Sequence, residues 1–312
     1  MTINELNRLA KDRVPFLFIS DFLAQNIKVI PLNELYLHDI DFCIDENYKY
    51  KKHSEFFEKE STDFNSYKEK FENIIQEIKS GNTYLLNLTA PTEVKSDLSL
   101  KEIYLLANAH YKLRYKDKFV CFSPEKFIQI KDNKINAYPM KGTIDASLVD
   151  AKQKILKNEK EMAEHIMVVD LLRNDLSIVA NNVKVQKFRY VQEIDSGEKK
   201  LLQVSSHISG DIGDDWRENL GNILNSLLPA GSISGTPKKS TLEIIKKTEA
   251  YDRGYFSGIF GIFDGESFDS GVMIRFVQKT KNGYIYKSGG GITLDSDASD
   301  EYSELLDKIY LP

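Results

Sequence analysis

The alternation of apolar and polar positions predicts many short strands. Apolar or alternating runs lie at residues 14–22, with 29–30 as a possible partner, and at 84–89, 119–122, 127–130, 134–137, 183–192, 201–208, 256–263, 269–278 and 283–287. The runs at 127–130 and 134–137 are close enough to form a hairpin, and those at 183–192 and 201–208 can pair in the same way. Residues 38–60 have no clear period, so strand and loop are expected there.

Helical spacing predicts a smaller number of helices. Apolar residues recur at this spacing before a stop at Gly81, namely Tyr67, Phe71, Ile74, Ile75 and Ile78. Ser99 and Glu102 form a capping box that opens a helix expected to reach about residue 114. Further helices are expected over 148–180, from a cap at Asp214 to residue 228, from a cap at Thr236 onward with Pro237 as its first residue, and around residues 301–308.

The order of these elements favours the α+β class. Strands follow one another in runs instead of alternating with helices, which is typical of largely antiparallel sheets. A length of 312 residues suggests about two domains, but no linker rich in Gly, Ser or Pro divides the chain. We therefore expect a single domain over residues 1–312, with a short N-terminal region at 1–60 and a core at 61–312 that carries the chemical motifs.

Composition and charge exclude several classes of function. The net charge is −5 and the basic residues are scattered, so neither nucleic acid nor an anionic membrane is expected as a partner. Two cysteines, Cys43 and Cys121, form neither a disulfide framework nor a metal-ligand spacing. The N-terminal residues are polar, unlike a signal peptide, and no apolar run reaches membrane-spanning length. A cytoplasmic protein is expected.

Residues 138–143, Tyr-Pro-Met-Lys-Gly-Thr, place Lys141 on a turn that leaves the strand at 134–137. The proline fixes φ two residues before the lysine, and the glycine after it lets the backbone or a ligand approach closely. A lysine beside a glycine is usually a solvated loop residue, so this segment alone indicates little. Its weight comes from four further motifs at residues 123–127, 161–175, 231–238 and 289–308.

Two pairs of glutamates share one spacing. Glu161 and Glu164 lie three residues apart on one predicted helix, and Glu301 and Glu304 repeat this on another. Each pair therefore points in one direction. Most such pairs lie on a solvated helix face. If the two pairs faced each other, they would form an all-oxygen site of the kind that Mg²⁺ prefers.

Together the five motifs resemble those of the chorismate-utilising enzymes, which include anthranilate synthase component I, aminodeoxychorismate synthase component I, and the isochorismate and salicylate synthases. The resemblance covers roughly residues 60–312. It implies two large stacked β-sheets, mainly antiparallel, with helices packed outside, and Mg²⁺ as the cofactor. It also implies that Glu164 and Glu304 bind Mg²⁺ directly, while Glu161 and Glu301 act through water.

The lysine in the Pro-x-Lys-Gly-Thr motif points, within that family, to aminodeoxychorismate synthase component I, an enzyme of folate (para-aminobenzoate) synthesis. The resemblance implies that Lys141 attacks C2 of chorismate, that Glu125 protonates the departing C4 hydroxyl, and that ammonia then adds at C4. A lowered pKa would suit Lys141, and neighbouring carboxylates would raise the pKa of Glu125. Alternatively, Lys141 binds substrate without reacting, and Glu125 is a surface residue.

The resemblance also implies residues that bind the substrate. Arg275 matches the family arginine that pairs with the enolpyruvyl carboxylate, a contact that suits a planar guanidinium. The other expected contacts, through backbone amides or hydroxyl groups, are Gly290, Gly291, Ser232 and Thr143. Taken alone, each glycine run is more often a flexible loop.

The chain departs from the family pattern at two positions. Leu85 stands where isochorismate and salicylate synthases carry a water-activating lysine, and Gln203 stands where anthranilate synthases carry a histidine. The nearest alternative function is anthranilate synthase component I, and isochorismate synthase is a weaker one. The chain has no Gly-x-Cys-x-Gly motif, so the resemblance implies that a separate glutamine amidotransferase subunit supplies ammonia.

Overall fold

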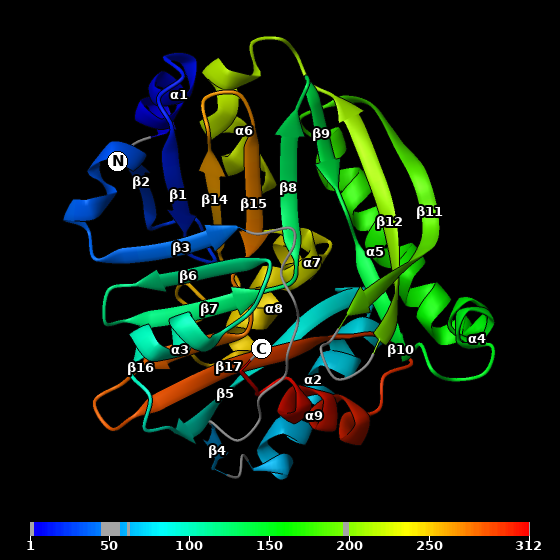
Figure 1. Ribbon diagram of the computed structural model, residues 1–312. Helices are drawn as coiled ribbons and strands as arrows, with labels where there is room; N and C mark the ends of the chain where they lie inside the picture. The colour runs from blue at the N-terminus through cyan, green and yellow to red at the C-terminus, as the bar shows by residue number, and fades with distance from the viewer. Residues whose placement is uncertain (1–2, 45–56, 61–62, 196–199, 312) are drawn as a thin grey trace.

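The computed structural model describes residues 3–44, 57–60, 63–195 and 200–311. Within them the chain forms two β-sheets, and every described pair of neighbouring strands is antiparallel. In Figure 1 the strands of one sheet run roughly up the page, and those of the other run across its lower half. The expected α+β class with two large antiparallel sheets is confirmed.

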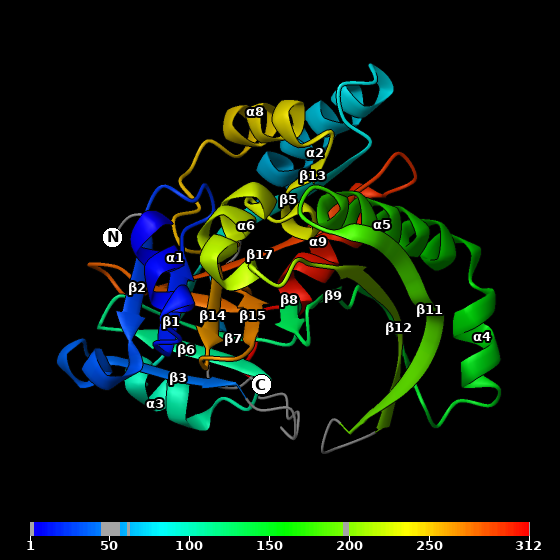
Figure 2. The ribbon, with the colours of Figure 1, turned by 90° about the horizontal axis from the view of Figure 1, so that it is seen from above.

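The first sheet has nine strands, drawn from almost the whole length of the chain. In spatial order they are β10 (Met140–Asp145), β12 (Lys200–Asp211), β9 (Lys134–Ala137), β8 (Lys126–Lys131), β15 (Phe268–Val272), β14 (Ile259–Phe263), β1 (Phe16–Ser20) and β2 (Ile27–Pro31). The ninth strand, β11 (Asn181–Asp195), pairs with β12, and both curve strongly in Figure 2. The predicted hairpins β8–β9 and β11–β12 are both present.

The second sheet has eight strands. In spatial order they are β13 (Gly235–Thr236), β5 (Leu85–Lys95), β17 (Tyr284–Ile292), β16 (Phe276–Lys279), β7 (Phe119–Ser123), β6 (Tyr111–Tyr115) and β3 (Ile40–Ile44), and β4 (Glu58–Lys59) pairs with β5. The segment expected to hold strand and loop thus contributes β3 and β4. Residues 45–56 of that segment lie outside the described residues.

Strand β1 shows how both faces of the nine-stranded sheet are filled. Its apolar residues Phe16, Leu17, Phe18 and Ile19 are all buried. Leu17 and Ile19 belong to a cluster that includes β6, β7 and β16 of the second sheet, whereas Phe16 and Phe18 belong to a larger cluster with the helices. Because alternate side chains of a strand point to opposite faces, this strand contributes to both parts of the core.

The helices cover the sheets. They are α1 (Ile3–Lys11), η1 (Leu32–Leu37), α2 (Phe64–Lys79), α3 (Leu100–Leu106), α4 (Ala151–Lys157), α5 (Glu159–Ser177), η2 (Trp216–Asn219), α6 (Leu220–Leu227), α7 (Gly231–Ser234), α8 (Lys238–Glu249) and α9 (Ala298–Asp307). In Figure 2, α2, α5, α6 and α8 lie along one side, and α3 lies on the opposite side near β3. Among the described residues, no helix is both long and apolar enough to cross a membrane.

The predicted helix that begins at Ser99 is shorter than expected. The capping box with Glu102 is confirmed, but α3 ends at Leu106. The following residues form β6, which pairs with both β3 and β7, so tertiary pairing overrides the local helical spacing. Lys112 on β6 also donates hydrogen bonds to the carbonyls of Tyr104 and Ala107, which closes the C-terminal end of α3.

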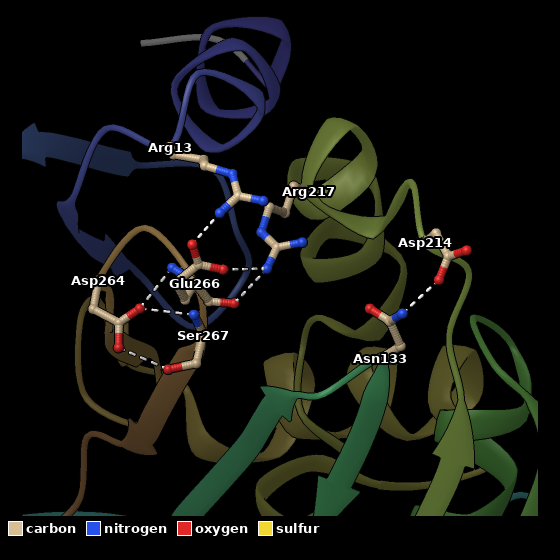
Figure 3. Close-up of polar contacts among 7 residues, drawn as sticks. All are labelled: Arg13, Asn133, Asp214, Arg217, Asp264, Glu266 and Ser267. Atoms are coloured by element: carbon tan, nitrogen blue, oxygen red, sulfur yellow. Dashed lines mark hydrogen bonds and ion pairs between the residues drawn. The ribbon is translucent and has the colours of Figure 1, made fainter.

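Two predicted helix caps are wrong in position. Asp214 accepts a hydrogen bond from the side chain of Asn133 (Figure 3), and the following helix η2 begins after Asp215. Thr236 belongs to β13, and Pro237 stands at the cap position before α8. In both places the earlier residue makes a contact outside the helix, Asp214 with Asn133 and Thr236 with Leu85 on β5, and the helix begins after it.

Two predicted continuous elements are interrupted. The expected strand over 269–278 forms β15 and β16, which belong to different sheets, and Arg275 lies between them with φ of 51°. The helical region over 148–180 contains α4 and α5. Asn158 separates them, because its side chain accepts a hydrogen bond of 3.0 Å from the amide of Glu161 and caps α5.

One end of the nine-stranded sheet carries a surface network of polar contacts (Figure 3). Glu266, in the β14–β15 turn, pairs with Arg13 and, at 2.9 Å, with Arg217. Asp264 accepts hydrogen bonds from Ser267 in the same turn. These contacts connect the end of α1 to η2, although exposed ion pairs each stabilise a fold only weakly.

Packing between the sheets predicts a large effect for Phe260→Ala. Phe260 is fully buried and lies edge-on to Tyr111 with 6.1 Å between ring centroids. Its truncation should lower the free energy of unfolding by about 3–5 kcal/mol. Urea unfolding measures this, with Tyr36→Ala as the control because Tyr36 is 83% exposed. Equal losses in the two variants would contradict the described core.

Candidate functional site

A cavity of about 250 Å³ lies where the two sheets meet, and residues from both sheets line it. Its wall includes β10, β12 and the segment between β7 and β8, together with β5, β17, α5, α7 and the end of α9. The predicted site residues on this wall are Glu125, Lys141, Glu164, Ser232, Arg275, Gly290, Gly291 and Glu304. The structure thus brings together motifs that are as far apart as residues 125 and 304.

Three predicted site residues do not line the cavity. Glu161 and Glu301 are not part of the wall, but they interact electrostatically with residues that are, among them Lys141. Thr143 is exposed on β10 and does not belong to the wall. Lys141 lies within strand β10, so the turn expected at 138–143 is replaced by a strand with irregular pairing to β12.

Strand β10 passes very close to helix α5. Its pairing with β12 shifts register between Met140 and Thr143, and Gly142 there has φ of 87°. A side chain at this position would place its Cβ 3.2 Å from Oε2 of Glu161. Glycine therefore permits both the left-handed backbone and the close approach, and it leaves the adjacent Lys141 facing the same helix.

Lys141 and Glu164 form an ion pair within the cavity. The distance from Nζ to Oε2 is 2.6 Å. Burial lowers the pKa of Lys141, but Glu164, Glu304 and Glu161 together outweigh this effect and raise the pKa above its usual value. The expectation of a lowered pKa is therefore wrong for the chain by itself, since the carboxylates favour the charged ammonium.

Three of the four glutamates, Glu161, Glu301 and Glu304, have different environments. Burial raises the pKa of Glu161, although Lys141 opposes this effect, and burial also raises the pKa of Glu301, which accepts a hydrogen bond of 2.9 Å from Ser296. Burial also acts to raise the pKa of Glu304, but Lys308, 2.7 Å away, outweighs it and the pKa is lowered. The site thus combines carboxylates that resist ionisation with one that is held ionised.

The donor set suits a hard cation. Oε2 of Glu161 is buried and has no hydrogen-bond partner among the residues that the structure describes, an arrangement that is costly without a compensating charge. Carboxylate oxygens are the ligands that Mg²⁺ prefers. In the described part of the chain, however, no three His, Cys, Asp or Glu side chains are grouped closely enough to hold a metal as they stand. The chemistry of these residues therefore fits Mg²⁺, and the ligand geometry stays a prediction.

Glu125 lies between β7 and β8 at the cavity wall. Its backbone is fixed on both sides, since its amide donates to Oγ of Ser123 and its carbonyl accepts from Val272. Its side-chain Oε1 accepts a hydrogen bond of 2.8 Å from Ser232. Burial raises the pKa of Glu125, only partly offset by Ser232, Arg275 and Lys308. A raised pKa was expected for an acid, but its cause is burial and not neighbouring carboxylates.

Arg275 and Lys308 supply positive charge to the same cavity. Nε of Arg275 donates a hydrogen bond of 3.1 Å to the hydroxyl of Tyr310, and the guanidinium lies over that ring. Lys308, which the sequence analysis did not assign to the site, lines the cavity and binds both Glu304 and the carbonyl of Gly289. The sequence did contain a signal for this role, because Lys308 lies four residues after Glu304 on a predicted helix and can therefore pair with it.

The glycine run and the two departures from the family pattern all reach the cavity. Residues 289–291 lie within β17, so the flexible loop considered for them is wrong. A Cβ at Gly290 would lie 3.1 Å from Oε2 of Glu301, which repeats the close approach of strand and helix seen at β10. Leu85 and Gln203 both line the cavity, and Leu85 adds to an apolar part of the wall.

Comparison with known proteins supports one family for this fold and site. The model of the chorismate binding enzyme family matches residues 33–311. A PabA-like protein of Haemophilus influenzae is 47% identical over 318 residues, covering 99% of this chain and 96% of that protein. Aminodeoxychorismate synthase component 1 of Bacillus subtilis is 26% identical, covering 93% of this chain and 63% of that protein.

A solved structure supports the fold. MenF, the menaquinone-specific isochorismate synthase of Escherichia coli, superimposes with a TM-score of 0.73 at 15% identity. The match covers 97% of this chain and 79% of that structure. At this identity the likeness concerns the fold alone, and it agrees with the two stacked antiparallel sheets.

The ion pair in the cavity predicts how Lys141 titrates without metal. Because the carboxylate of Glu164 helps to raise the pKa of Lys141, Glu164→Gln should lower that pKa. Nitrogen-15 NMR of the lysine side chains in metal-free protein measures the midpoint, and the signal lost in Lys141→Ala identifies it. Glu193→Gln is the matched control, since Glu193 pairs with Lys200 at the surface. An unchanged midpoint in Glu164→Gln would contradict the ion pair.

Proposed function

The chain belongs to the chorismate-binding enzymes, and we propose that it is the component of aminodeoxychorismate synthase that converts chorismate and ammonia to 4-amino-4-deoxychorismate. The observation that carries this proposal is the pairing of an amine and an acid in one cavity. Lys141 offers the amine, and Glu125 offers a carboxyl group whose pKa is raised by burial. This pair suits a reaction that replaces a hydroxyl group by way of a covalent intermediate.

In the proposed reaction, Nζ of Lys141 forms a bond to C2 of chorismate while the bond between C4 and its hydroxyl breaks. Glu125 gives its proton to the departing oxygen, which leaves as water. Ammonia then forms a bond to C4, and the bond between C2 and Nζ breaks, which restores Lys141. The nitrogen that has added at C4 releases one proton, which returns to Glu125. Hydroxide is a poor leaving group, so an acid whose pKa is raised by burial is well suited to this step.

Lys141 must lose a proton before it attacks. The ion pair with Glu164 opposes this, because the carboxylates around it raise its pKa. A bound Mg²⁺, held by Glu164 and Glu304 with Glu161 and Glu301 behind them, would neutralise those carboxylates and hold a substrate carboxylate. Lys141 would then be a buried amine among neutralised groups, where burial favours its uncharged form.

The remaining contacts suit a dicarboxylate. Arg275 faces the cavity with a guanidinium that can bind a carboxylate through two parallel hydrogen bonds. Gly290 and Gly291 offer backbone close to the cavity, where the absence of side chains leaves room for the ring. We assign no substrate contact to Thr143, because it is exposed outside the cavity wall.

We propose that ammonia comes from a separate glutamine amidotransferase subunit. The likeness to a component 1 protein supports this, because a component by its name acts with another. In the sequence neither cysteine lies in the Gly-x-Cys-x-Gly motif of a glutaminase nucleophile, and in the fold Cys121 is fully buried on β7. The chain can also use free ammonia, since its own site would carry out the chemistry at the ring.

Two further functions remain as alternatives within the family. Anthranilate synthase component I would also release pyruvate from the ring, and isochorismate synthase would add water in place of ammonia. Gln203 and Leu85 on the cavity wall count against both, since an amide cannot donate a proton as an imidazolium does and an alkyl side chain cannot activate water.

A product assay tests the proposed function. With chorismate, MgCl₂ and an ammonium salt, the protein should form 4-amino-4-deoxychorismate and no pyruvate, as followed by mass spectrometry and a coupled pyruvate assay. Addition of EDTA should abolish turnover, and excess MgCl₂ should restore it. Pyruvate formed without an added lyase would identify an anthranilate synthase, and isochorismate would identify an isomerase.

The covalent step predicts an adduct on Lys141. Incubation with chorismate and Mg²⁺ in the absence of ammonia should give protein whose mass increases by that of chorismate less water, and peptide mapping should place this mass on Lys141. Lys141→Ala should lose the adduct and the product. Lys141→Arg separates the two roles of this residue, because arginine keeps the charge but stays protonated and cannot attack. An active Lys141→Arg enzyme would overturn the covalent mechanism.

A further inference from the structure

The hydroxyl group that holds Glu125 comes from a very short helix. Ser232 is the second residue of α7, which has only four residues. A helix of this length is unstable by itself. Fixing the backbone of the first turn costs more free energy than its hydrogen bonds provide. The position of the Ser232 hydroxyl, 2.8 Å from Oε1 of Glu125, therefore depends on what fixes α7 from outside.

Asp175, near the C-terminal end of α5, holds both sides of this turn. Its Oδ2 accepts a hydrogen bond of 3.2 Å from the amide of Gly231, the first residue of α7. Its Oδ1 lies 3.2 Å from Nζ of Lys238, the first residue of α8, which also donates to the carbonyl of Leu227. One carboxylate thus spans the segment that carries Ser232.

The turn also packs directly on α5. A Cβ at Gly231 would lie 2.6 Å from Oδ2 of Asp175 and 3.1 Å from Cγ of Leu171, so no larger residue fits there without displacing the turn. Asp175 is only 8% exposed, and burial raises its pKa against the opposing effects of Lys238 and the Gly231 amide. A buried carboxylate with these two partners is a fixed support, not a mobile surface group.

The other charged groups near Glu125 cannot replace the hydroxyl. Arg275, between β15 and β16, and Lys308, after α9, both act on Glu125 through their charge. Ser232, by contrast, donates a hydrogen bond of 2.8 Å directly to the carboxyl group of Glu125. The hydroxyl therefore sets the orientation of the acid, and the two cations set the field around it.

We propose that Asp175 is a positioning residue of this site, which holds α7 so that the Ser232 hydroxyl stays on Glu125. The role of Glu125 as an acid rests on the proposed function, but the positioning does not. Because α5 also carries Glu164 at its other end, one helix fixes both the acid, through Asp175, and a carboxylate of the lysine pair. About 16 Å of helix separates the two residues, at 1.5 Å per residue.

Titration of Glu125 in the protein without substrate or metal tests this proposal. Carbon-13 NMR of glutamate-labelled protein follows the carboxyl signals, and the signal lost in Glu125→Gln identifies the right one. Ser232→Ala removes a hydrogen bond that lowers the pKa of Glu125, so its midpoint should move to higher pH. Asp175→Ala should move the midpoint in the same direction. The variant that combines Asp175→Ala with Ser232→Ala should have the same midpoint as Ser232→Ala alone.

Two further variants keep the test decisive if Asp175→Ala does not fold. Asp175→Asn retains an oxygen that can accept from the Gly231 amide and should stay closer to the wild-type midpoint. Gly231→Ala leaves Asp175 and Ser232 intact but displaces the turn, so it should reproduce the upward shift. Asp170→Ala on the same helix is the matched control and should have no effect, because Asp170 is exposed and pairs with Arg173 at the surface.

Turnover gives a second, separate measurement. If the proposed function holds, Asp175→Ala should lower kcat by roughly tenfold to a hundredfold, as misplaced catalytic groups do, and should change KM less. The alkaline limb of its pH profile should move upward together with the NMR midpoint. If the wild type shows no turnover but the midpoint of Glu125 still shifts in the variants, the proposed function is rejected. The positioning of Glu125 through Asp175 is then retained. An unshifted midpoint in Asp175→Ala or in Ser232→Ala would reject the positioning.

Discussion

The structure depends on the neutralisation of carboxylates that gather where two sheets meet. Two Lys–Glu pairs do this at the cavity, Lys141 with Glu164 and Lys308 with Glu304. Each pair stands beside a place where a strand comes close to a glutamate of a helix: a Cβ at Gly142 would lie 3.2 Å from Oε2 of Glu161 on α5, and one at Gly290 would lie 3.1 Å from Oε2 of Glu301 on α9. Charges that are partly removed from water are costly unless they are paired, so these ion pairs favour this arrangement of strands and helices.

This arrangement explains why the site needs both sheets. The amine comes from β10 of the nine-stranded sheet, and the glycine run comes from β17 of the eight-stranded sheet. Arg275 stands where the chain crosses from one sheet to the other, in the left-handed region of φ that residues other than glycine rarely adopt. This backbone conformation is strained, and such strain is typical of functional sites. Here it occurs where a charged side chain reaches the cavity.

The sequence predicted the strands and the chemical groups better than it predicted their boundaries and contacts. Alternating runs such as 127–130 and 134–137 formed the expected hairpin, because their period and their turn agree. The helix from Ser99 was drawn too long, since pairing with β3 and β7 is a long-range contact that local spacing cannot register. Ser232 was assigned to the substrate, and its bond to Glu125 joins residues 107 positions apart.

The reversal of the expected pKa for Lys141 has the same origin. Its value depends on three carboxylates that lie on two different helices, so no local motif contains it. Lys308 is the opposite case, because its spacing from Glu304 was visible in the sequence. What escaped prediction was therefore the sum of effects across the cavity, not the identity of the groups.

The crossing at Arg275 has a mechanical consequence. The arginine connects directly to β15 in one sheet and to β16 in the other, while the glutamates are carried by helices that pack on the sheets. A ligand bound by the arginine at one end and by the carboxylates at the other would link the two sheets to each other. Occupancy of the cavity would then stabilise the whole molecule against unfolding. A ligand that binds only the folded form increases the free energy that is needed to separate the two layers.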